Sequence, residues 1–206
     1  KEQLAATTTG KPTTYAKSVP RKLLPGIVAD NKDAFVQGEW QSSQLLPHYV
    51  GENYIHDDKR DKGSKTVSFE VQLPEDGQYE VRISYTANNS RAVNVPVAIT
   101  HSGNEQTTVT VNQRQQPEID GLFHALGKFH FKSNEAAQIV ISNKGTQGHV
   151  IVDAVQFVRA VPTDSTAKTD TPTNPAADEE NKIKRELKQL EAELMSLQQA
   201  APKREM

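Results

Sequence analysis

The sequence predicts a mainly β protein, an antiparallel β-sandwich that is jelly-roll-like, with an amphipathic α-helix near its C-terminus. The first observation is a series of short segments between residues 25 and 160 in which apolar and polar side chains alternate. The second is that turn-forming residues separate these segments, with no strong helical pattern between them. The third is a helical repeat of leucines close to the end of the chain.

The expected strands follow one another along the chain. "TVSFEVQL" (66–73) leads into the turn "PEDG", and "QYEVRISY" (78–85) continues after it. Pro96 lies inside "AVNVPVAI" (92–99), which favours an edge strand or a bulge because proline has no N–H to give to a sheet. The remaining segments are "TTVTV" (107–111), "KFHF" (128–131), "AQIVIS" (137–142) and "HVIVDAVQFV" (149–158).

Two segments without apolar periodicity frame the predicted sandwich. Residues 1–24 form a stretch rich in Thr, Lys and Pro, residues 161–178 form one rich in Pro and Thr, and both are expected to be flexible linkers. The sandwich is therefore placed at residues 25–160. Residues 179–201 are expected to form a coiled-coil-like helix, which docks on the sandwich, associates with a copy of itself, or binds an absent partner. Its apolar seam consists of Ile183, Leu187, Leu190, Leu194 and Leu197.

The composition excludes several classes of function. Lys and Arg number 24 against 26 Asp and Glu, so the chain lacks the basic balance of a nucleic-acid-binding protein. No apolar run is long enough to cross a bilayer, and no signal peptide opens the sequence. The absence of cysteine excludes disulfides, thiolate metal sites and a cysteine nucleophile. The chain reads as a piece of a larger protein.

No motif typical of catalysis or of a metal site is present, so we expect no enzyme activity and no cofactor. The nucleophile motif GxSxG, the phosphate-binding loop and the dinucleotide-binding motif are all missing. The histidines form neither HExxH nor His-x-His, so no metal ligands are assigned. Calcium at Asp57, Asp58 and Asp61 is the alternative, and the basic residues interleaved with these aspartates oppose it.

The last predicted strand carries an aspartate among apolar residues. Asp153 shares its strand face with Ile151, Val155 and Phe157 unless a bulge intervenes. A buried carboxylate needs a partner. Asp153 is therefore expected to be a structural residue that is held by an arginine, the candidates being Arg82, Arg91 and Arg114.

The stretch "ENYIHDDKRDKG" (52–63) concentrates side chains that could contact a ligand. It is expected to be the end of a strand at residues 54–55 followed by a solvated charged loop up to Gly63. Aromatic rings can stack on the apolar face of a sugar, and polar side chains can bond its hydroxyl groups. The candidates for stacking are Trp40 and Tyr54, with core packing as the alternative for Trp40. The candidates for hydrogen bonds to a sugar are His56, Asp57, Arg91 and Arg114.

Several ordered stretches resemble the golvesin and xanthan-lyase-type carbohydrate-binding-like domain over residues 27–159. They are "ADNKDAFVQGEWQSS", "YVGENYIHD", "GQYEVRISYTANNSRAVNVPVAI", "VNQRQQP", "LGKFHF" and "GHVIVDAVQFV". The resemblance implies a β-sandwich accessory module inside a large exported bacterial protein. It also implies that Gly51 and Gly127 determine the fold through their backbone conformation.

Two functions remain open at this point. The first is a non-catalytic module that binds polysaccharide for a secreted multidomain protein, with acidic sugars favoured if Arg91 and Arg114 form charge-assisted bonds. The second is a structural or protein-interaction domain that positions neighbouring domains of the parent protein, with residues 179–201 mediating docking or oligomerisation.

Overall fold

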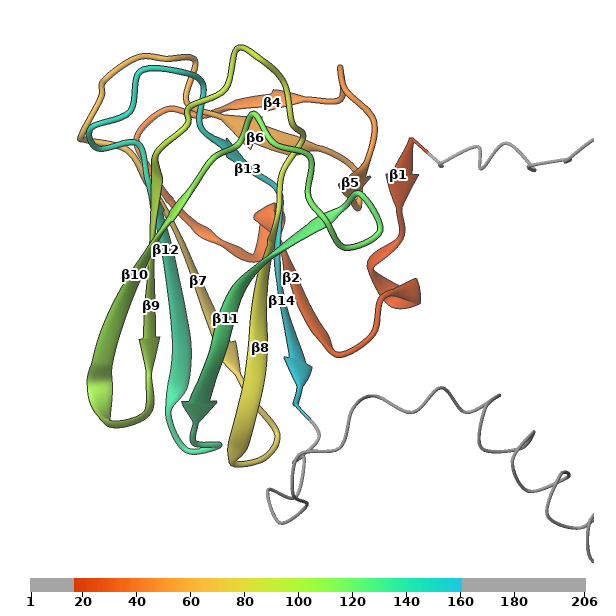
Figure 1. Cartoon of the computed structure of the whole chain (residues 1–206), viewed down its shortest axis with the longest axis vertical. Coiled ribbons are helices and arrows are strands. Elements are labelled where there is room, and N and C mark those ends of the chain that lie inside the picture. Colours follow the sequence, from red (N-terminus) through yellow and green to blue (C-terminus); the bar gives the residue numbers. More distant parts are fainter. Residues whose placement is uncertain (1–16, 161–206) are drawn as a thin grey trace, which may run out of the picture. The chain divides into compact units, whose positions relative to one another are not determined.

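Two antiparallel sheets face each other in the computed structural model, which describes residues 17–160 (Figure 1). The first sheet has the strand order β10 (Glu105–Val111), β9 (Val95–His101), β12 (Ala136–Ser142), β7 (Thr66–Gln72) and β3 (Phe35–Gln37). The second has the order β11 (Phe123–Phe131), β8 (Gly77–Ser84), β14 (Ala154–Arg159) and β2 (Ile27–Asp30). The long strands change sheet at nearly every connection, apart from the β9–β10 hairpin. The prediction of an antiparallel β-sandwich is confirmed for this part of the chain.

The core between the sheets follows the predicted alternation of apolar residues. In β7, Val67, Phe69 and Val71 are buried while the side chains between them face outward. The two sheets meet through contacts such as that between the rings of Phe131 and Phe157, whose centroids are 5.6 Å apart. Burial of each such large apolar side chain stabilises the fold by about 1.5–3 kcal/mol.

Smaller elements cover one end and one side of the sandwich. The chain adds a three-stranded sheet in the order β13 (Ile151–Val152), β6 (Tyr54–His56) and β4 (Gln41–Ser43). It also adds a parallel pair, β1 (Ser18–Val19) with β5 (Tyr49–Val50). Three short 3-10 turns complete the described elements: η1 (Arg21–Leu23), η2 (Asn31–Asp33) and η3 (Ser102–Asn104).

The structure corrects the N-terminal boundary of the domain. Residues 17–24 were expected to belong to a flexible linker, but β1 pairs with β5, and Val19 and Leu24 pack on a second apolar cluster. This cluster contains Val50, Leu122, Phe123 and Ala154. The folded domain therefore begins before residue 25. Residues 1–16, the expected linker at 161–178 and the expected helix at 179–201 lie outside the described residues.

Two further corrections concern strand β9. Pro96 does not lie on an edge strand, because β10 and β12 flank β9 on both sides. It is the second residue of the strand, and the register with β12 extends only from Val97 to Thr100, so its missing N–H leaves that ladder complete. Val93 was expected to alternate with polar residues in this strand, but it precedes β9 and is 48% exposed.

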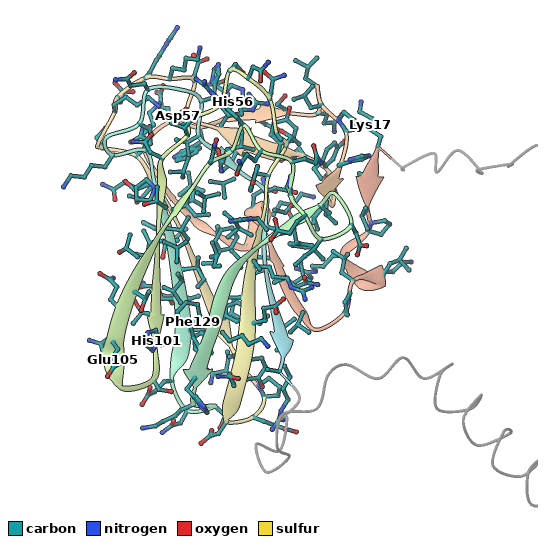
Figure 2. The ribbon with its side chains drawn as sticks, in the orientation of Figure 1. Lys17, His56, Asp57, His101, Glu105 and Phe129 are labelled. Carbon is teal, nitrogen blue, oxygen red and sulfur yellow. The ribbon has the colours of Figure 1, made fainter. Side chains whose placement is uncertain are left out.

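The two ends of the sandwich differ in character. Figure 2 places His56 and Asp57 at the end that carries the long connections, and His101, Glu105 and Phe129 at the opposite end. The latter end consists of short turns and the β9–β10 hairpin, where the rings of His101 and Phe129 lie 5.2 Å apart. Among residues 17–160, no helix has the length and apolar character that a membrane span requires.

Candidate functional site

Four connections meet at one end of the sandwich, which we call the loop end: residues 57–65, 85–94, 112–122 and 143–150. They meet there because each connection precedes or follows a long strand at the same end of the antiparallel sheets. Backbone bonds hold three of them together: the N–H of Ala92 donates to the carbonyl of His149 at 2.9 Å, and that of Gln113 to the carbonyl of Ala92 at 3.0 Å.

A buried carboxylate organises the first connection. Asp57 is fully buried. Its Oδ1 accepts hydrogen bonds from the backbone N–H groups of Lys59 at 3.1 Å and Val150 at 2.9 Å. Its Oδ2 accepts from Lys62 Nζ at 2.5 Å and Asn143 Nδ2 at 3.2 Å. Both oxygens are thus fully engaged, and Asp57 anchors the loop instead of facing a ligand, which corrects the expectation that it bonds a sugar.

The electrostatics of Asp57 agree with this anchoring role. Burial by itself raises the pKa of Asp57, but the hydrogen bonds from Lys62, Val150 and Lys59 outweigh burial and lower the pKa below its ordinary value. The carboxylate is therefore ionised at neutral pH and paired with the Lys62 ammonium.

Neighbouring groups extend the anchor into a polar network. Lys62 Nζ also donates to Thr146 Oγ1 at 2.9 Å and to the carbonyl of Gly148 at 2.6 Å. Lys65, whose side chain is 3% exposed, donates to the carbonyl of Asp57 at 3.0 Å. The stretch after residue 56 is therefore not a freely solvated loop, as the sequence suggested, because its central charges are buried against residues 143–150.

Two of the expected ligand-binding residues are used by the fold. Tyr54 is 1% exposed, and its hydroxyl accepts hydrogen bonds from Ser43 Oγ and the N–H of Leu46, both at 3.2 Å. Arg91 is 8% exposed and donates from Nε to the carbonyl of Thr86 at 3.1 Å. A buried ring cannot stack on a sugar, so the stacking role expected for Tyr54 is corrected, and Arg91 is directed into its own loop.

Arg114, by contrast, is exposed beside a cleft of about 320 Å³. Its Nε donates to the carbonyl of Arg91 at 3.0 Å, which fixes the side chain and leaves the two terminal nitrogens without a partner among the described residues. Asn94 is held on the other side by a bond from Nδ2 to the carbonyl of Gly145 at 2.9 Å. The cleft is lined by Ala92, Val93, Asn94, Arg114, Gly145, Gln147 and Gly148.

Asn94 and Gln147 are cleft residues that the sequence did not single out. Gln147 stands in a stretch rich in turn-forming residues, so the sequence indicated a loop there, whereas Asn94 fell inside the expected strand 92–99. Nothing in a single sequence, however, indicates that these loops meet Arg114.

Trp40 lies outside the residues that line this cleft. Its ring is half-buried and packs on the main core, and Nε1 donates to the carbonyl of Gln37 at 3.1 Å. This placement matches the core-packing alternative, although one part of the ring remains accessible to solvent.

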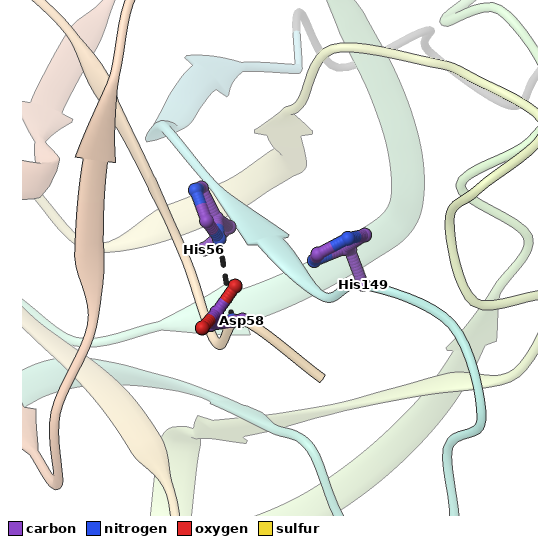
Figure 3. Close-up of side chains that lie close together, drawn as sticks. All are labelled: His56, Asp58 and His149. Carbon is purple, nitrogen blue, oxygen red and sulfur yellow. Dashed lines mark hydrogen bonds between the residues drawn. The ribbon is translucent and has the colours of Figure 1, made fainter. Parts of the chain in front are cut away.

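His56 closes β6 and lies beside a second histidine. The rings of His56 and His149 meet edge to face with centroids 5.3 Å apart. His56 Nδ1 accepts a hydrogen bond from the N–H of Asp58 at 3.2 Å (Figure 3). Burial lowers the pKa of both imidazoles, and the positive charge of Arg91 contributes in each case. Both rings are therefore neutral at pH 7.

The three aspartates considered for calcium each form an ion pair. Asp57 pairs with Lys62 at 2.5 Å, Asp58 with Arg60 at 3.2 Å, and Asp61 with Lys65 at 3.3 Å. These basic partners would compete with a calcium ion for the carboxylates.

Gly51 and Gly127 occupy positions that suit glycine. Gly51 has φ +68°, and a Cβ there would lie 2.3 Å from Asp30 Oδ2. Gly127 has φ +139° at a bulge where the register of β11 with β8 shifts. Both glycines thus permit a backbone path that other residues would strain.

Asp153 is fully buried between β13 and β14, but the expected arginine partner is wrong. Its Oδ2 accepts hydrogen bonds from the N–H of Val50 at 2.9 Å and from Ser84 Oγ. Oδ1 has no hydrogen-bond partner among the described residues. Burial raises the pKa of Asp153 to about 8, so the group carries a proton at neutral pH. The candidate arginines bond elsewhere: Arg82 to Glu80 and Gln156, Arg91 to Thr86, and Arg114 to the carbonyl of Arg91.

Known proteins show similarity to this chain over the described sandwich. The xanthan lyase of Bacillus sp. (strain GL1) is 33% identical over 141 residues, which cover 66% of this chain and 15% of the lyase. The solved structure of Paenibacillus xanthan lyase has a TM-score of 0.61 at 34% identity, over 65% of this chain and 13% of the lyase. A Podospora anserina GH26-CBM35 β-(1,4)-mannanase has a TM-score of 0.49 at 16% identity, over 72% of this chain and 31% of the mannanase.

The chain thus spans 15% of the length of the curated relative that it matches. Its similarity to a family of domains extends from the start of β2 to the end of β14, which confirms the resemblance inferred from the ordered sequence stretches. Over residues 27–159 the chain matches, and it belongs to, the Golvesin C-terminal domain family.

Proposed function

We propose that the domain is a non-catalytic accessory module that binds polysaccharide, with a preference for acidic sugars, within a larger exported bacterial protein. The relation to xanthan lyases, at 33% and 34% identity, supports a role beside a polysaccharide-degrading activity. The match to a small part of the lyase length supports the role of an accessory part. The activity of the parent protein belongs to this proposal as well.

The observation that carries the proposal is the cleft beside Arg114. The terminal nitrogens of its anchored guanidinium can donate to a carboxylate in the paired geometry that arginine favours. The side chains of Asn94 and Gln147 add amide donors and acceptors for hydroxyl groups, and exposed Val93 adds an apolar contact. This combination suits a sugar ring that carries an acidic group.

The state of the two fully buried carboxylates supports the non-catalytic part of the proposal. Asp57 is bonded at both oxygens, and Asp153 is sealed from solvent. A general acid or base must come within hydrogen-bond reach of a substrate proton. Neither carboxylate can do so without opening the fold.

Substitution of Arg114 tests this site. Titration calorimetry of the chain with acidic, sulfated and neutral polysaccharides measures the affinity. Loss of a charge-assisted hydrogen bond, about 1.5–3 kcal/mol, weakens binding of an acidic polysaccharide by roughly tenfold or more in Arg114→Ala. Arg60→Ala is the matched control, because the Arg60 side chain is 78% exposed and lies outside the cleft. Equal affinities of both variants and the native chain would exclude the cleft.

The alternative function, a protein-interaction module, is favoured by an exposed aromatic residue. Phe35 is 75% exposed on the edge strand β3, opposite Ser68 of β7. Val140 of β12 lies on the other side of Ser68 in the same row, so two apolar side chains stand on the outer face of the sheet. Docking of a neighbouring domain, or of residues 179–201, would cover this face.

Light scattering distinguishes the alternatives. The expected result for a docking face is self-association of the native chain that Phe35→Ser reduces, while Arg114→Ala leaves it unchanged. If the native chain and Phe35→Ser are both monomeric at all concentrations, self-association through this face is excluded.

A further inference from the structure

Three side chains with metal-binding atoms lie together at the loop end, apart from the cleft (Figure 3). His56, Asp58 and His149 each offer one ligand atom, and these atoms lie within 4.8 Å of one another. Among the residues that the structure describes, this is the one such group of histidines and carboxylates.

Strand pairing and the turn after β6 bring the three residues together. In the pair of β6 with β13, His56 lies opposite Ile151 and Ile55 opposite Val152. The pairing continues for one residue beyond β6, and Asp58 follows in a turn with φ +53°. The N–H of Asp57 donates to the carbonyl of Val150 at 3.2 Å, which shows that the two segments stay paired beyond the strands. Asp58 stays beside His56 because its N–H donates to His56 Nδ1 at 3.2 Å.

The backbone that carries the three ligands is fixed. The Asp57 carboxylate binds the N–H groups of Lys59 and Val150, so it ties one segment to the other between the ligand positions. His149 donates its N–H to the carbonyl of Ser90 at 3.0 Å and accepts from the N–H of Ala92 at 2.9 Å. A metal ion would therefore find its ligands on a rigid frame, with side-chain rotation as the remaining adjustment.

The state of the side chains suits a metal ion. His149 Nδ1 is buried and has no hydrogen-bond partner within residues 17–160. The imidazole rings of His56 and His149 lie edge to face with centroids 5.3 Å apart, so their nitrogens can approach one ion. The pair of Asp58 with Arg60 is at the surface, where such pairs contribute about 0–1 kcal/mol and are easily replaced.

We propose that His56, Asp58 and His149 bind a divalent transition metal ion of the zinc class. Two imidazole nitrogens and one carboxylate oxygen are ligands that zinc prefers, whereas calcium takes oxygen ligands. Tetrahedral zinc sites have ligand atoms roughly 3.3 Å apart, so the side chains close by at most about 1.5 Å on binding. The fourth position is left for water or for an oxygen of a bound molecule.

Positive charges set a limit to the affinity of this site. The positive charges of Lys59 and Arg91 lie close enough to His149 to act on it electrostatically, and those of Arg91 and Lys65 do the same at His56. These charges would repel a bound metal ion. His56 Nδ1 also gives up its bond from the N–H of Asp58 if that nitrogen binds the metal ion. We therefore expect reversible binding that a strong chelator reverses without unfolding the sandwich.

Titration of the full chain with Zn²⁺ and Co²⁺ tests the proposal. The expected result is one metal ion per chain by calorimetry and a visible absorption band of four-coordinate Co²⁺. Calcium in excess leaves both signals unchanged. Zn²⁺ shifts the ring nitrogen resonances of His56 and His149 in the unmodified protein, which needs no variant.

Variants assign the ligands. His149→Ala and Asp58→Asn each weaken Zn²⁺ binding by at least about tenfold. Even the loss of a residue that only hydrogen-bonds to a metal ligand lowers metal affinity by about that factor. Asp58→Asn keeps the side-chain volume and removes only the surface pair with Arg60, so it retains the fold. His130→Ala, which removes an exposed imidazole elsewhere, is the matched control. Absence of stoichiometric binding, or equal loss in His130→Ala, would overturn the proposal, and neither result bears on polysaccharide binding at Arg114.

Discussion

Asp57 and Asp153 are both fully buried, yet their surroundings produce opposite charge states. At the loop end, Asp57 receives bonds at both oxygens and an ammonium partner, and its pKa is lowered. Between β13 and β14, Asp153 receives bonds at one oxygen only, and burial raises its pKa to about 8. The charge of a buried carboxylate is thus decided by its donors and not by burial itself.

The two aspartates also contribute to stability with opposite pH dependence. The folded pKa of Asp57 lies below the ordinary value of 3.8, so its contribution is present above about pH 4 and is lost as the pH falls through the lowered pKa. The folded pKa of Asp153 lies above that value, so its contribution is present at low pH and is lost as the pH rises towards about 8. The variants below test whether this contrast holds.

Loss of the Asp57 charge is expected to have the largest effect. Asp57→Asn leaves the Lys62 ammonium without its carboxylate and destabilises the domain by about 2–4 kcal/mol, since Lys62 is only partly buried. Urea denaturation at pH 7 measures the free energy of unfolding. Asp58→Asn is the control, because its partner Arg60 is 78% exposed, and it costs about 1 kcal/mol or less. Similar losses in both variants would contradict an anchoring role for Asp57.

Replacement of Asp153 should change the pH profile. Between pH 4 and pH 8 the folded chain holds a proton on Asp153 that the unfolded chain has released, so stability falls by up to about 1.4 kcal/mol per pH unit. Asp153→Asn keeps an oxygen that can accept from Val50 and Ser84 but has no proton to lose. The variant therefore gains stability over the native chain from pH 5 to pH 8.

Urea denaturation at several pH values measures the free energy of unfolding of the native chain and of Asp153→Asn. The difference between these two free energies at each pH is the quantity to compare. Taking the difference cancels the contributions of His56 and His149, which are the same in both chains. Parallel profiles would show that Asp153 has an ordinary pKa in the folded state.

The surroundings of Asp153 can also be changed through Gly51, which follows Val50. A Cβ at Gly51 would displace Asp30, whose negative charge helps to raise the pKa of Asp153. Gly51→Ala is expected to cost about 1–3 kcal/mol more than Gly145→Ala, since alanine at positive φ costs about 1–2 kcal/mol at either site. Gly145 has φ +72° and no atom within 4 Å of a Cβ. Thermal unfolding compares the two, and equal shifts in midpoint would exclude the steric contribution.

Arg60→Ala gives the smallest expected effect, a change within about 0.5 kcal/mol. The pair of Arg60 with Asp58 is exposed, in contrast to the pair of Lys62 with Asp57 nearby. Urea denaturation serves again as the measurement. A loss above about 1 kcal/mol would mean that surface charges of this loop support the fold as the buried pair does.

The sandwich could be predicted from the sequence because alternation records which side chains face the core. Val67, Phe69 and Val71 alternate with polar residues, and they are buried as expected. The short parallel pairing of Ser18–Val19 with Tyr49–Val50 could not be predicted, because two residues are too few to form a pattern. The order of the strands in each sheet could not be predicted either. Alternation shows which face of a strand is buried, but it does not show which strands pair with one another.

The site was harder to predict because its contacts are distant in sequence. The charges after His56 suggested a solvated loop, yet Asn143, Thr146 and Val150 supply the partners that bury them. For Asp153, its position in the alternating pattern correctly indicated burial. A backbone N–H and a serine, however, take the place of the expected arginine. His56 and His149 stood apart in the sequence, and only the register of β6 with β13 makes them neighbours.

The unequal attachment of the first and last described strands has a mechanical consequence. β1 is attached to β5 through two paired residues, whereas β14 is bonded to β8 on one side and to β2 on the other. Under tension along the chain, two paired residues hold β1, whereas the longer pairings on both sides of β14 must all break before it is released. We expect β1 to yield first under such a force and to lengthen the chain, while the sandwich and its loop end keep their shape.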